Sequence, residues 1–146
     1  MRSVAGGLIA LVLLFFYIIL VLKAAKVAEC IGTNCGTLTA ANFNDVMAQA
    51  MSVLGGLVSA LIISELAVTE PGQTPGERML KSGSKAKNIL RGTTICYILA
   101  WLAIGAWAFW KGLNYPDALP SLTSVGQSWL GLSVASAYAY FGIRGK

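Results

Sequence analysis

The stretch VAGGLIALVLLFFYIILVL, residues Val4–Leu22, decides the fold because it carries no charged side chain. A helix of this length is roughly 28 Å long, close to the ~30 Å thickness of the hydrocarbon core of a bilayer. A cleaved signal peptide is the alternative, with Arg2 as its positive start. The apolar part of a signal peptide is only ~7–15 residues long, however. We therefore expect an uncleaved transmembrane span.

The composition of the chain also indicates a lipid environment. Of its 146 residues, 56% are hydrophobic and 12% are charged, whereas soluble domains average ~45–50% apolar and ~25% charged residues. The sequence has no histidine, the commonest metal ligand and the side chain that most readily acts as a base near neutral pH. It also offers no catalytic Ser/His/Asp set and no metal-binding cluster. We therefore expect no enzymatic activity, no cofactor and no metal site.

Three further apolar runs follow the first. Together the four predict an all-α integral membrane protein, a four-transmembrane-helix bundle. Asn42, Asn44 and Asp45 stand before the second run as candidate N-caps. The fourth run contains several serines and Gln127, and a re-entrant or surface-lying segment is its alternative. The expected single domain has spans at about 4–22, 46–68, 93–110 and 122–141, joined by an outer loop at 23–45, a basic inner loop at 69–92 and an outer turn at 111–121.

The positive charges predict how this bundle is oriented, because Lys and Arg concentrate on the cytoplasmic side of membrane proteins. In a four-span arrangement, eight of the 11 cations share the side of the two termini and three lie opposite. We therefore expect a multi-pass protein of the plasma or inner membrane with both termini in the cytoplasm. The larger set is Arg2, Arg78, Lys81, Lys85, Lys87, Arg91, Arg144 and Lys146, and the smaller is Lys23, Lys26 and Lys111.

The basic inner loop contains GQTPGERMLKSGSK, but it does not match a phosphate-binding loop. That motif needs G-x-x-x-x-G-K-[ST], and neither Gly76 nor Gly83 is followed by Lys. A cation close to an anionic membrane surface contributes about 1 kcal/mol to binding. We expect the loop to lie at anionic headgroups of the inner leaflet or to act only as a topology signal, and we expect no nucleic-acid partner. Its cations are Arg78, Lys81, Lys85, Lys87 and Arg91.

Glu65 is the one acidic residue well inside an expected span. Burying a carboxylate at mid-membrane costs about 2.5 kcal/mol or more, so such a residue is a candidate functional site. Glu65 lies one turn from the inner end of its span, where Arg91 or Arg144 could pair with it. A structural ion pair and a role in ion coupling are the two hypotheses.

Small residues recur at every fourth position of the second run. Such faces let helix backbones approach closely, and helix association in membranes depends on that packing. We expect the second and fourth spans to pack together through these faces within one chain, with packing against another chain as the alternative. The faces are Ala48, Ser52, Gly56, Ala60 and Ser64 in the second run, and Gly131, Ala135 and Ala139 in the fourth.

Cys30 and Cys35, in CIGTNC, fall in the expected outer loop, on the side where disulfides persist. A structural disulfide and a pair of free thiols are both open. Redox exchange is not favoured, because the C-x-x-C spacing typical of such proteins is missing.

These features predict a small non-catalytic membrane protein, an accessory or structural subunit that packs laterally in a larger complex. Its partners would be the lipid bilayer and other membrane subunits or copies of itself. The alternative is a pore-forming protein or small transporter, either holin-like or ion-coupled through Glu65. Gln49, Gln127 and the serines of the fourth run could then line a polar path.

Overall fold

The computed structural model describes residues 2–68 and 84–142, and within these ranges every regular element is helical. This confirms the all-α prediction. The chain forms α1 (Arg2–Gly32), the short 3-10 helix η1 (Ala40–Asn42), α2 (Asp45–Val68), α3 (Ser84–Asn114) and α4 (Pro120–Gly142).

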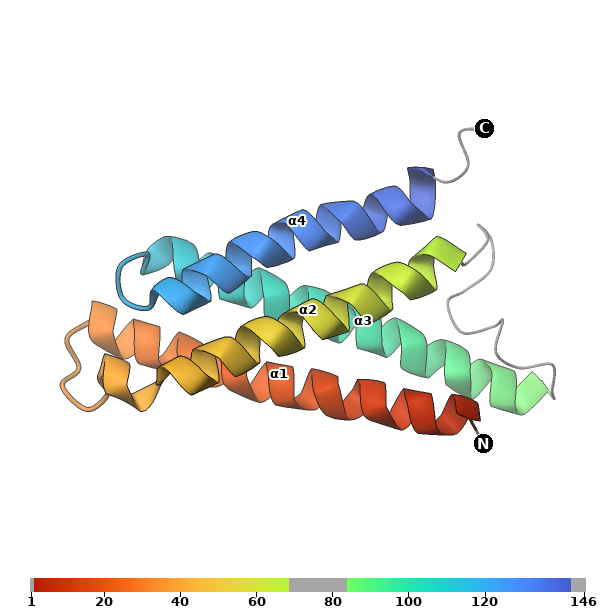
Figure 1. Ribbon diagram of the computed structural model, residues 1–146, viewed down its shortest axis with the longest axis horizontal. Helices are drawn as coiled ribbons and strands as arrows, with labels where there is room; N and C mark the ends of the chain where they lie inside the picture. The colour runs from red at the N-terminus through yellow and green to blue at the C-terminus, as the bar shows by residue number, and fades with distance from the viewer. Residues whose placement is uncertain (1, 69–83, 143–146) are drawn as a thin grey trace.

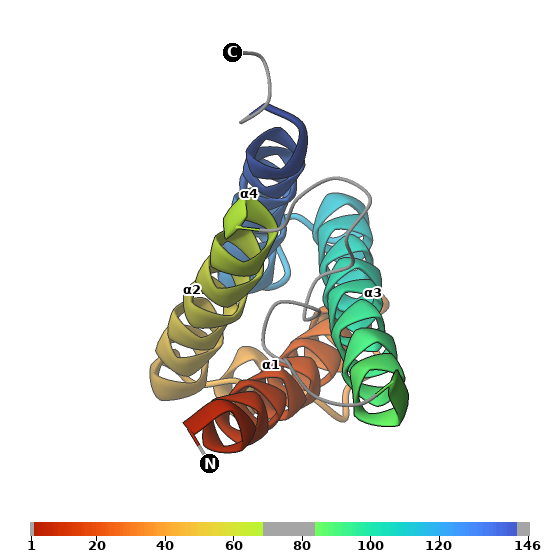
Figure 2. The ribbon, with the colours of Figure 1, turned by 90° about the vertical axis from the view of Figure 1, so that its right-hand side faces the viewer.

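The four α-helices lie side by side along the long axis of the molecule (Figure 1). The α1–α2 and α3–α4 connections lie at one end of the bundle, which we call the loop end. Helix α1 starts, and helix α4 finishes, at the opposite end. Seen along the bundle, the cyclic order is α1, α2, α4, α3, so that α2 and α3 are diagonal partners (Figure 2).

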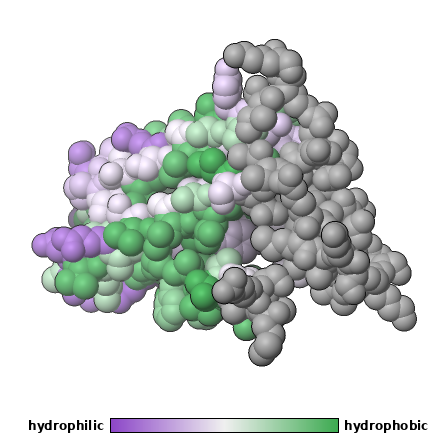
Figure 3. Space-filling view, turned by 45° about the vertical axis from the view of Figure 1, so that its right-hand side comes forward, coloured by the Kyte–Doolittle hydropathy of each residue, from purple (hydrophilic) through white to green (hydrophobic). Residues whose placement is uncertain are grey.

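Within residues 2–68 and 84–142, three helices are long and apolar enough to cross a membrane. They cover Gly6–Gly32, Asp45–Ser64 and Gly92–Asn114. Helix α4 is not among them, because its serines and Gln127 lower its hydropathy. The outside of the bundle is nevertheless apolar on every helix, as the exposed Phe15, Leu57, Leu99 and Val134 illustrate. Figure 3 shows hydrophobic residues over much of the visible side, with hydrophilic residues towards the loop end.

Two helices are longer than the sequence predicted. Helix α1 does not end at Leu22 but continues to Gly32 through the first part of the expected outer loop. The physical reason is packing, since Ala24, Ala25 and Ala28 are buried and allow neighbouring helices to approach closely. Helix α3 begins at Ser84, inside the expected inner loop. Both helices therefore extend beyond the expected spans into the expected loops.

The interior of the bundle is filled by large side chains from all four helices. The most deeply buried are Tyr17 of α1, Met51 of α2, Trp101 of α3 and Leu122 of α4. Lipid tails are as apolar as these side chains, so close van der Waals packing, rather than escape from water, supplies much of the association energy.

Helix α2 begins with a side-chain cap. The Oδ1 atom of Asn44 accepts a hydrogen bond from the backbone N–H of Met47 at 3.0 Å. This identifies Asn44 as the N-cap among the candidates Asn42, Asn44 and Asp45. Such a cap typically contributes about 1 kcal/mol to stability.

Helices α3 and α4 approach each other closely at a glycine that the sequence patterns did not single out. A Cβ atom at Gly126 would lie 2.8 Å from the Cα of Phe109. Gly105 of α3 also leaves no room for a side chain, because a Cβ there would overlap the indole of Trp129. These two glycines set the separation of α3 and α4 and the position of the Trp129 ring.

Candidate functional site

A pocket of about 220 Å³ lies inside the bundle between α1, α2 and α4. Three serine hydroxyls and two aromatic rings line it, and Val125 and Leu132 of α4 complete its wall. The polar and aromatic residues are Tyr17 of α1, Ser52 and Ser59 of α2, and Ser128 and Trp129 of α4. The pocket therefore combines an apolar wall with a few polar groups.

Ser59 is held in place by the helix diagonally opposite. The indole Nε1 of Trp101 on α3 donates a hydrogen bond to Ser59 Oγ at 3.1 Å. Trp101 is 1% exposed and Ser59 2% exposed, so the bond lies within the protein interior. Because a serine hydroxyl can accept and donate at once, Ser59 can still donate its own proton to an acceptor in the pocket.

Trp129, which also lines the pocket, carries a buried donor. Its Nε1 atom is buried, and among the described residues it has no hydrogen-bond partner. An indole N–H can only donate, and a buried donor without an acceptor costs about 1–3 kcal/mol. The Trp129 ring packs against Trp101 with centroids 6.1 Å apart and ring planes tilted by 59°.

The pocket exists because the inward side of α2 carries small residues. Gly55 is so close to Tyr17 that an added Cβ would lie 3.0 Å from the phenol ring. Gly55 and Ser59 are buried and Gly56 is exposed. Exposed Ser52 and Ser128 also line the pocket, so it opens sideways between α2 and α4.

The predicted small-residue face of α2 lies largely outside the bundle. Ser52, Gly56, Ala60 and Ser64 are exposed, and Ala48 is half-buried. On α4, Gly131 and Ala135 are exposed and Ala139 is half-buried. Helices α2 and α4 do pack together. Four of the small residues are nevertheless exposed on the outside of the bundle, namely Ala60, Ser64, Gly131 and Ala135. The spacing was visible in the sequence, whereas the direction in which it points was not.

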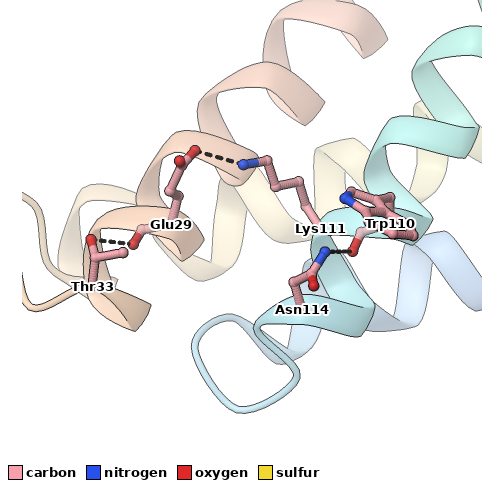
Figure 4. A network of polar contacts seen from close by, with 5 residues as sticks. All are labelled: Glu29, Thr33, Trp110, Lys111 and Asn114. Atoms are coloured by element: carbon pink, nitrogen blue, oxygen red, sulfur yellow. Dashed lines mark hydrogen bonds and ion pairs between the residues drawn. The ribbon is translucent and has the colours of Figure 1, made fainter.

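An ion pair ties α1 to α3 at the loop end (Figure 4). Lys111 Nζ lies 2.7 Å from Glu29 Oε2, and its side chain is 13% exposed. The same ammonium lies 5.3 Å from the centre of the Trp107 ring and 5.7 Å from that of Tyr115. Close by, Asn114 Nδ2 donates to the carbonyl of Trp110 at 2.9 Å. This cluster links α1 to α3 at the loop end.

The cysteines of CIGTNC lie together at the same end. Cys30 and Cys35 form a disulfide, with their Cα atoms 5.0 Å apart. The turn between them includes Asn34 in a left-handed conformation at φ 54°. Cys96, on α3, is free and exposed on the outside of the bundle. Among the described residues, no cluster of His, Cys, Asp and Glu could hold a metal ion.

The predicted charge site receives no test from this structure. Glu65 lies on α2 and Arg91 on α3, but their side chains lie outside the described part of the chain. Lys85 and Lys87 are likewise described only as parts of helix α3. Arg78, Lys81 and Arg144 fall outside the described residues.

Comparisons of the chain with protein-family models, with curated proteins and with solved structures find no match. The class of protein therefore rests on the fold itself, a helical bundle with three candidate membrane-spanning helices.

Proposed function

We propose that this protein is a four-span, non-catalytic subunit that packs laterally against other proteins in a membrane complex. One observation carries the proposal: the small-residue face of α2 is exposed along the bundle, at Ser52, Gly56, Ala60 and Ser64. A face of this kind lets a second helix approach closely, and it gives lipid tails little surface to pack against.

The exposed side of α2 has two distinct parts. Beside the small residues lie the larger side chains of Val53, Leu57 and Leu61, which are 61%, 48% and 42% exposed. The larger residues suit contact with lipid, and the small ones suit contact with a protein backbone. This division supports a lateral partner on one side of α2.

The proposal also includes two statements about topology: α4 crosses the membrane, and both termini lie on the cytoplasmic side. Helix α4 exposes Leu130, Val134, Tyr138 and Phe141, which supports contact with hydrocarbon along its outer side. The excess of Lys and Arg near both termini and the 69–92 segment supports a cytoplasmic location for that end. The cations of this segment would then meet anionic headgroups of the inner leaflet.

Substitution of Ala60 tests the lateral role. Ala60→Leu places a bulky side chain on the small-residue face, and Val53→Leu enlarges a neighbouring exposed residue by one methylene as the control. In mild detergent and in nanodiscs, wild-type protein and Val53→Leu should form cross-linkable assemblies, and Ala60→Leu should lose most of them. Recovery of the wild-type chain as a lone monomer under every condition contradicts the proposal.

A pore or small transporter is the second candidate. The observation that favours it is the exposure of Gln49 on α2 and of Gln127 on α4, beside the exposed Ser52 and Ser128. Polar groups on the outer side of spans could line a path between copies of the chain. Ion flux into proteoliposomes, measured with wild type and Glu65→Gln, tests it, and the absence of flux from both rules it out.

A further inference from the structure

We propose that a second copy of this chain packs on the α2–α4 side of the bundle and inserts its Gln127 side chain into the pocket. A two-fold axis relates the two copies, so each copy receives Gln127 from the other. The inference rests on the lateral role proposed above, and it names the partner and the residue that the partner contributes. Three observations lead to it, namely the hydroxyl groups of the pocket, the position of Gln127 and the open side of α2 and α4.

Four hydroxyl groups line the pocket, and none of them donates a hydrogen bond to any of the described residues. Tyr17 is 1% exposed, and its hydroxyl has no partner in this part of the chain. Ser59 accepts from Trp101 but does not donate. The other two hydroxyls belong to Ser52 and Ser128, which are exposed and form the mouth of the pocket. The pocket therefore suits a group that offers an acceptor atom.

Serines elsewhere on the same two helices behave differently. Three of them donate to backbone carbonyls of their own helix, at 2.9, 2.8 and 2.8 Å, namely Ser64, Ser133 and Ser136. Their hydroxyl protons are used within the chain, whereas those of the pocket serines stay available.

An amide side chain is the neutral group that matches these hydroxyls. Its oxygen accepts hydrogen bonds and its NH₂ group donates them, and a hydroxyl can do both. An apolar side chain would cover the hydroxyls without offering an acceptor, which is destabilising. The candidate span of α2, Asp45–Ser64, has its midpoint beside Gly55, which lines the pocket. A charged side chain is costly at that depth, and the residues that line the pocket carry no opposite charge.

Gln127 carries an amide of this kind at the depth of the pocket. It directly precedes Ser128 of the mouth, so the two residues differ by about 1.5 Å along the helix axis. Gln127 is exposed on α4, and its amide makes no hydrogen bond to the described residues. Lipid tails offer it neither a donor nor an acceptor. Glutamine side chains in membrane helices form hydrogen bonds across helix contacts, so Gln127 suits a contact with a second chain.

Symmetry brings Gln127 of one copy to the pocket of the other. Copies of a membrane protein share one orientation, which their positive charges set, and two-fold symmetry is the commonest in homo-oligomers. A rotation about the membrane normal leaves the depth of every residue unchanged. Gln127 of the second copy therefore arrives at the level of the mouth. Gln49 lies in the first two turns of α2, closer to the loop end, and does not match this level.

The side of the bundle around the mouth admits a close neighbour. Gly56 and Gly131 are both exposed, and nothing lies within 4 Å of the position that a Cβ would occupy at either residue. Gly131 follows Ser128 by three residues, so the two lie on the same side of α4. Small residues let the backbones of membrane helices approach closely. The volume of the pocket, about 220 Å³, is several times the ~30 Å³ share of a water molecule and leaves room for a side chain.

Cross-linking in the membranes of cells that co-express two differently tagged copies tests the proposal. Both copies have the three native cysteines replaced by alanine. One copy carries Gln127→Cys and the other Ser52→Cys, so every product joins two chains. A short bifunctional thiol reagent should join this pair. It should not join Gln127→Cys to Leu99→Cys, since Leu99 is exposed on α3 two residues from Trp101. Absence of the first product, or equal yields from the two pairs, overturns the proposal.

Energy transfer between labelled full-length copies in liposomes measures what the Gln127 side chain contributes. Gln127→Leu should weaken self-association about tenfold, because each pair of copies loses two hydrogen-bonded contacts. Gln49→Leu, the matched control, should change it less than about twofold, because water and headgroups near the membrane surface satisfy that amide. Wild-type affinity in Gln127→Leu, or equal losses in the two variants, overturns the proposal.

Tyr17→Phe tests the pocket from inside the bundle. This variant removes one hydroxyl and leaves the outer side of α2 and α4 unaltered. Self-association should weaken about threefold in the wild-type background and much less when Gln127 is already leucine, because the two groups belong to one contact. Strictly additive effects of the two substitutions overturn the insertion of Gln127 into the pocket.

The lateral role and the Gln127 contact fail in different ways. If Ala60→Leu loses its assemblies while Gln127→Leu keeps those of wild type, the lateral role stands and the Gln127 contact is overturned. If the wild-type chain is a lone monomer under every condition, both are overturned.

Discussion

Trp101 of α3 donates a hydrogen bond to Ser59 of α2 at 3.1 Å, across the diagonal of the four-helix bundle. Helices α2 and α3 are not neighbours around the bundle (Figure 2). The bond therefore links the α1–α2 pair to the α3–α4 pair through the interior of the bundle. It also fixes the position of the Ser59 hydroxyl, and Ser59 lines the pocket.

Loss of this bond should destabilise the protein measurably. Ser59→Ala removes the acceptor and leaves the buried Trp101 indole unpaired, and side-chain hydrogen bonds between membrane helices contribute about 0.6 kcal/mol on average and up to ~1.7. We expect a loss within this range in reversible unfolding from mixed micelles. Ser52→Ala, at an exposed serine of the same helix, is the control. A double-mutant cycle with Trp101→Phe should show non-additivity, and strictly additive effects contradict a direct bond.

Substitution of Lys111 should destabilise the protein more than substitution of Glu29. The Glu29 side chain is 51% exposed, and exposed ion pairs contribute ~0.2–1 kcal/mol, so Glu29→Gln should cost less than about 1 kcal/mol. Lys111→Ala should cost more, because it also removes contacts with Trp107 and Tyr115. Thermal unfolding at low and high salt checks both variants. Equal losses at high salt would argue against the aromatic contribution.

The Cys30–Cys35 disulfide should stabilise the loop end. The two residues are five positions apart, and closing so short a loop contributes roughly 2 kcal/mol in the chain-entropy model. The double variant Cys30→Ser/Cys35→Ser should lose about that much, and wild-type protein should show the same loss after reduction. Alkylation of unreduced protein should modify Cys96 alone, and labelling of all three cysteines contradicts the disulfide.

Gly126 should tolerate substitution far less well than Gly131. A methyl group at Gly126 meets the backbone of α3 at Phe109, whereas nothing lies within 4 Å at Gly131. Overpacking of this kind typically costs about 1–3 kcal/mol, so Gly126→Ala should lower stability by that amount and Gly131→Ala should not. Equal stability of the two variants shows that α3 and α4 are not in close contact at this position.

Labelling of single cysteines tests whether α4 spans the membrane. In a variant with the three native cysteines replaced by alanine, Asp117→Cys lies in the α3–α4 connection and Gly145→Cys near the C-terminus. A membrane-impermeant thiol reagent added to intact cells should label Asp117→Cys and spare Gly145→Cys until the membrane is opened. Labelling of both from outside, or of neither, contradicts four spans with a cytoplasmic C-terminus.

Several parts of the fold were predictable because they depend on local composition. The uncharged run at 4–22 predicted a helix that is long and apolar enough to cross a membrane. Asn44 was among the predicted N-caps of α2. Helices α1 and α3 extend beyond the expected spans, through residues 23–32 and 84–92, whose lysines and small residues resemble a connector. Burial of Ala24, Ala25 and Ala28 supports the longer α1, and that burial depends on the other helices.

The pocket could not be predicted, although its serines and glycines were visible in the sequence. Ser52 and Gly56 belong to the small-residue pattern of the second run, and Ser59 lies next to it, but only the rotation of α2 in the bundle turns Ser59 inward and Ala60 outward. The buried Nε1 of Trp129, which has no hydrogen-bond partner among the described residues, had no sequence signal, because the burial of an indole depends on its neighbours in space. Gly126 and Gly105 were missed for a similar reason, since their partners lie on a different helix.

By itself, the sequence indicated two properties of this protein, an apolar, lipid-like environment and helical secondary structure. Both follow from side chains and backbone groups that are close together along the chain, since an apolar run in lipid must satisfy its own hydrogen bonds as a helix. The tertiary structure alone decided which side of each helix is buried, where Trp101 meets Ser59 and where a pocket remains. These outcomes depend on contacts between residues distant in sequence, and a helical repeat leaves the direction of each face undetermined until the neighbouring helices are in place.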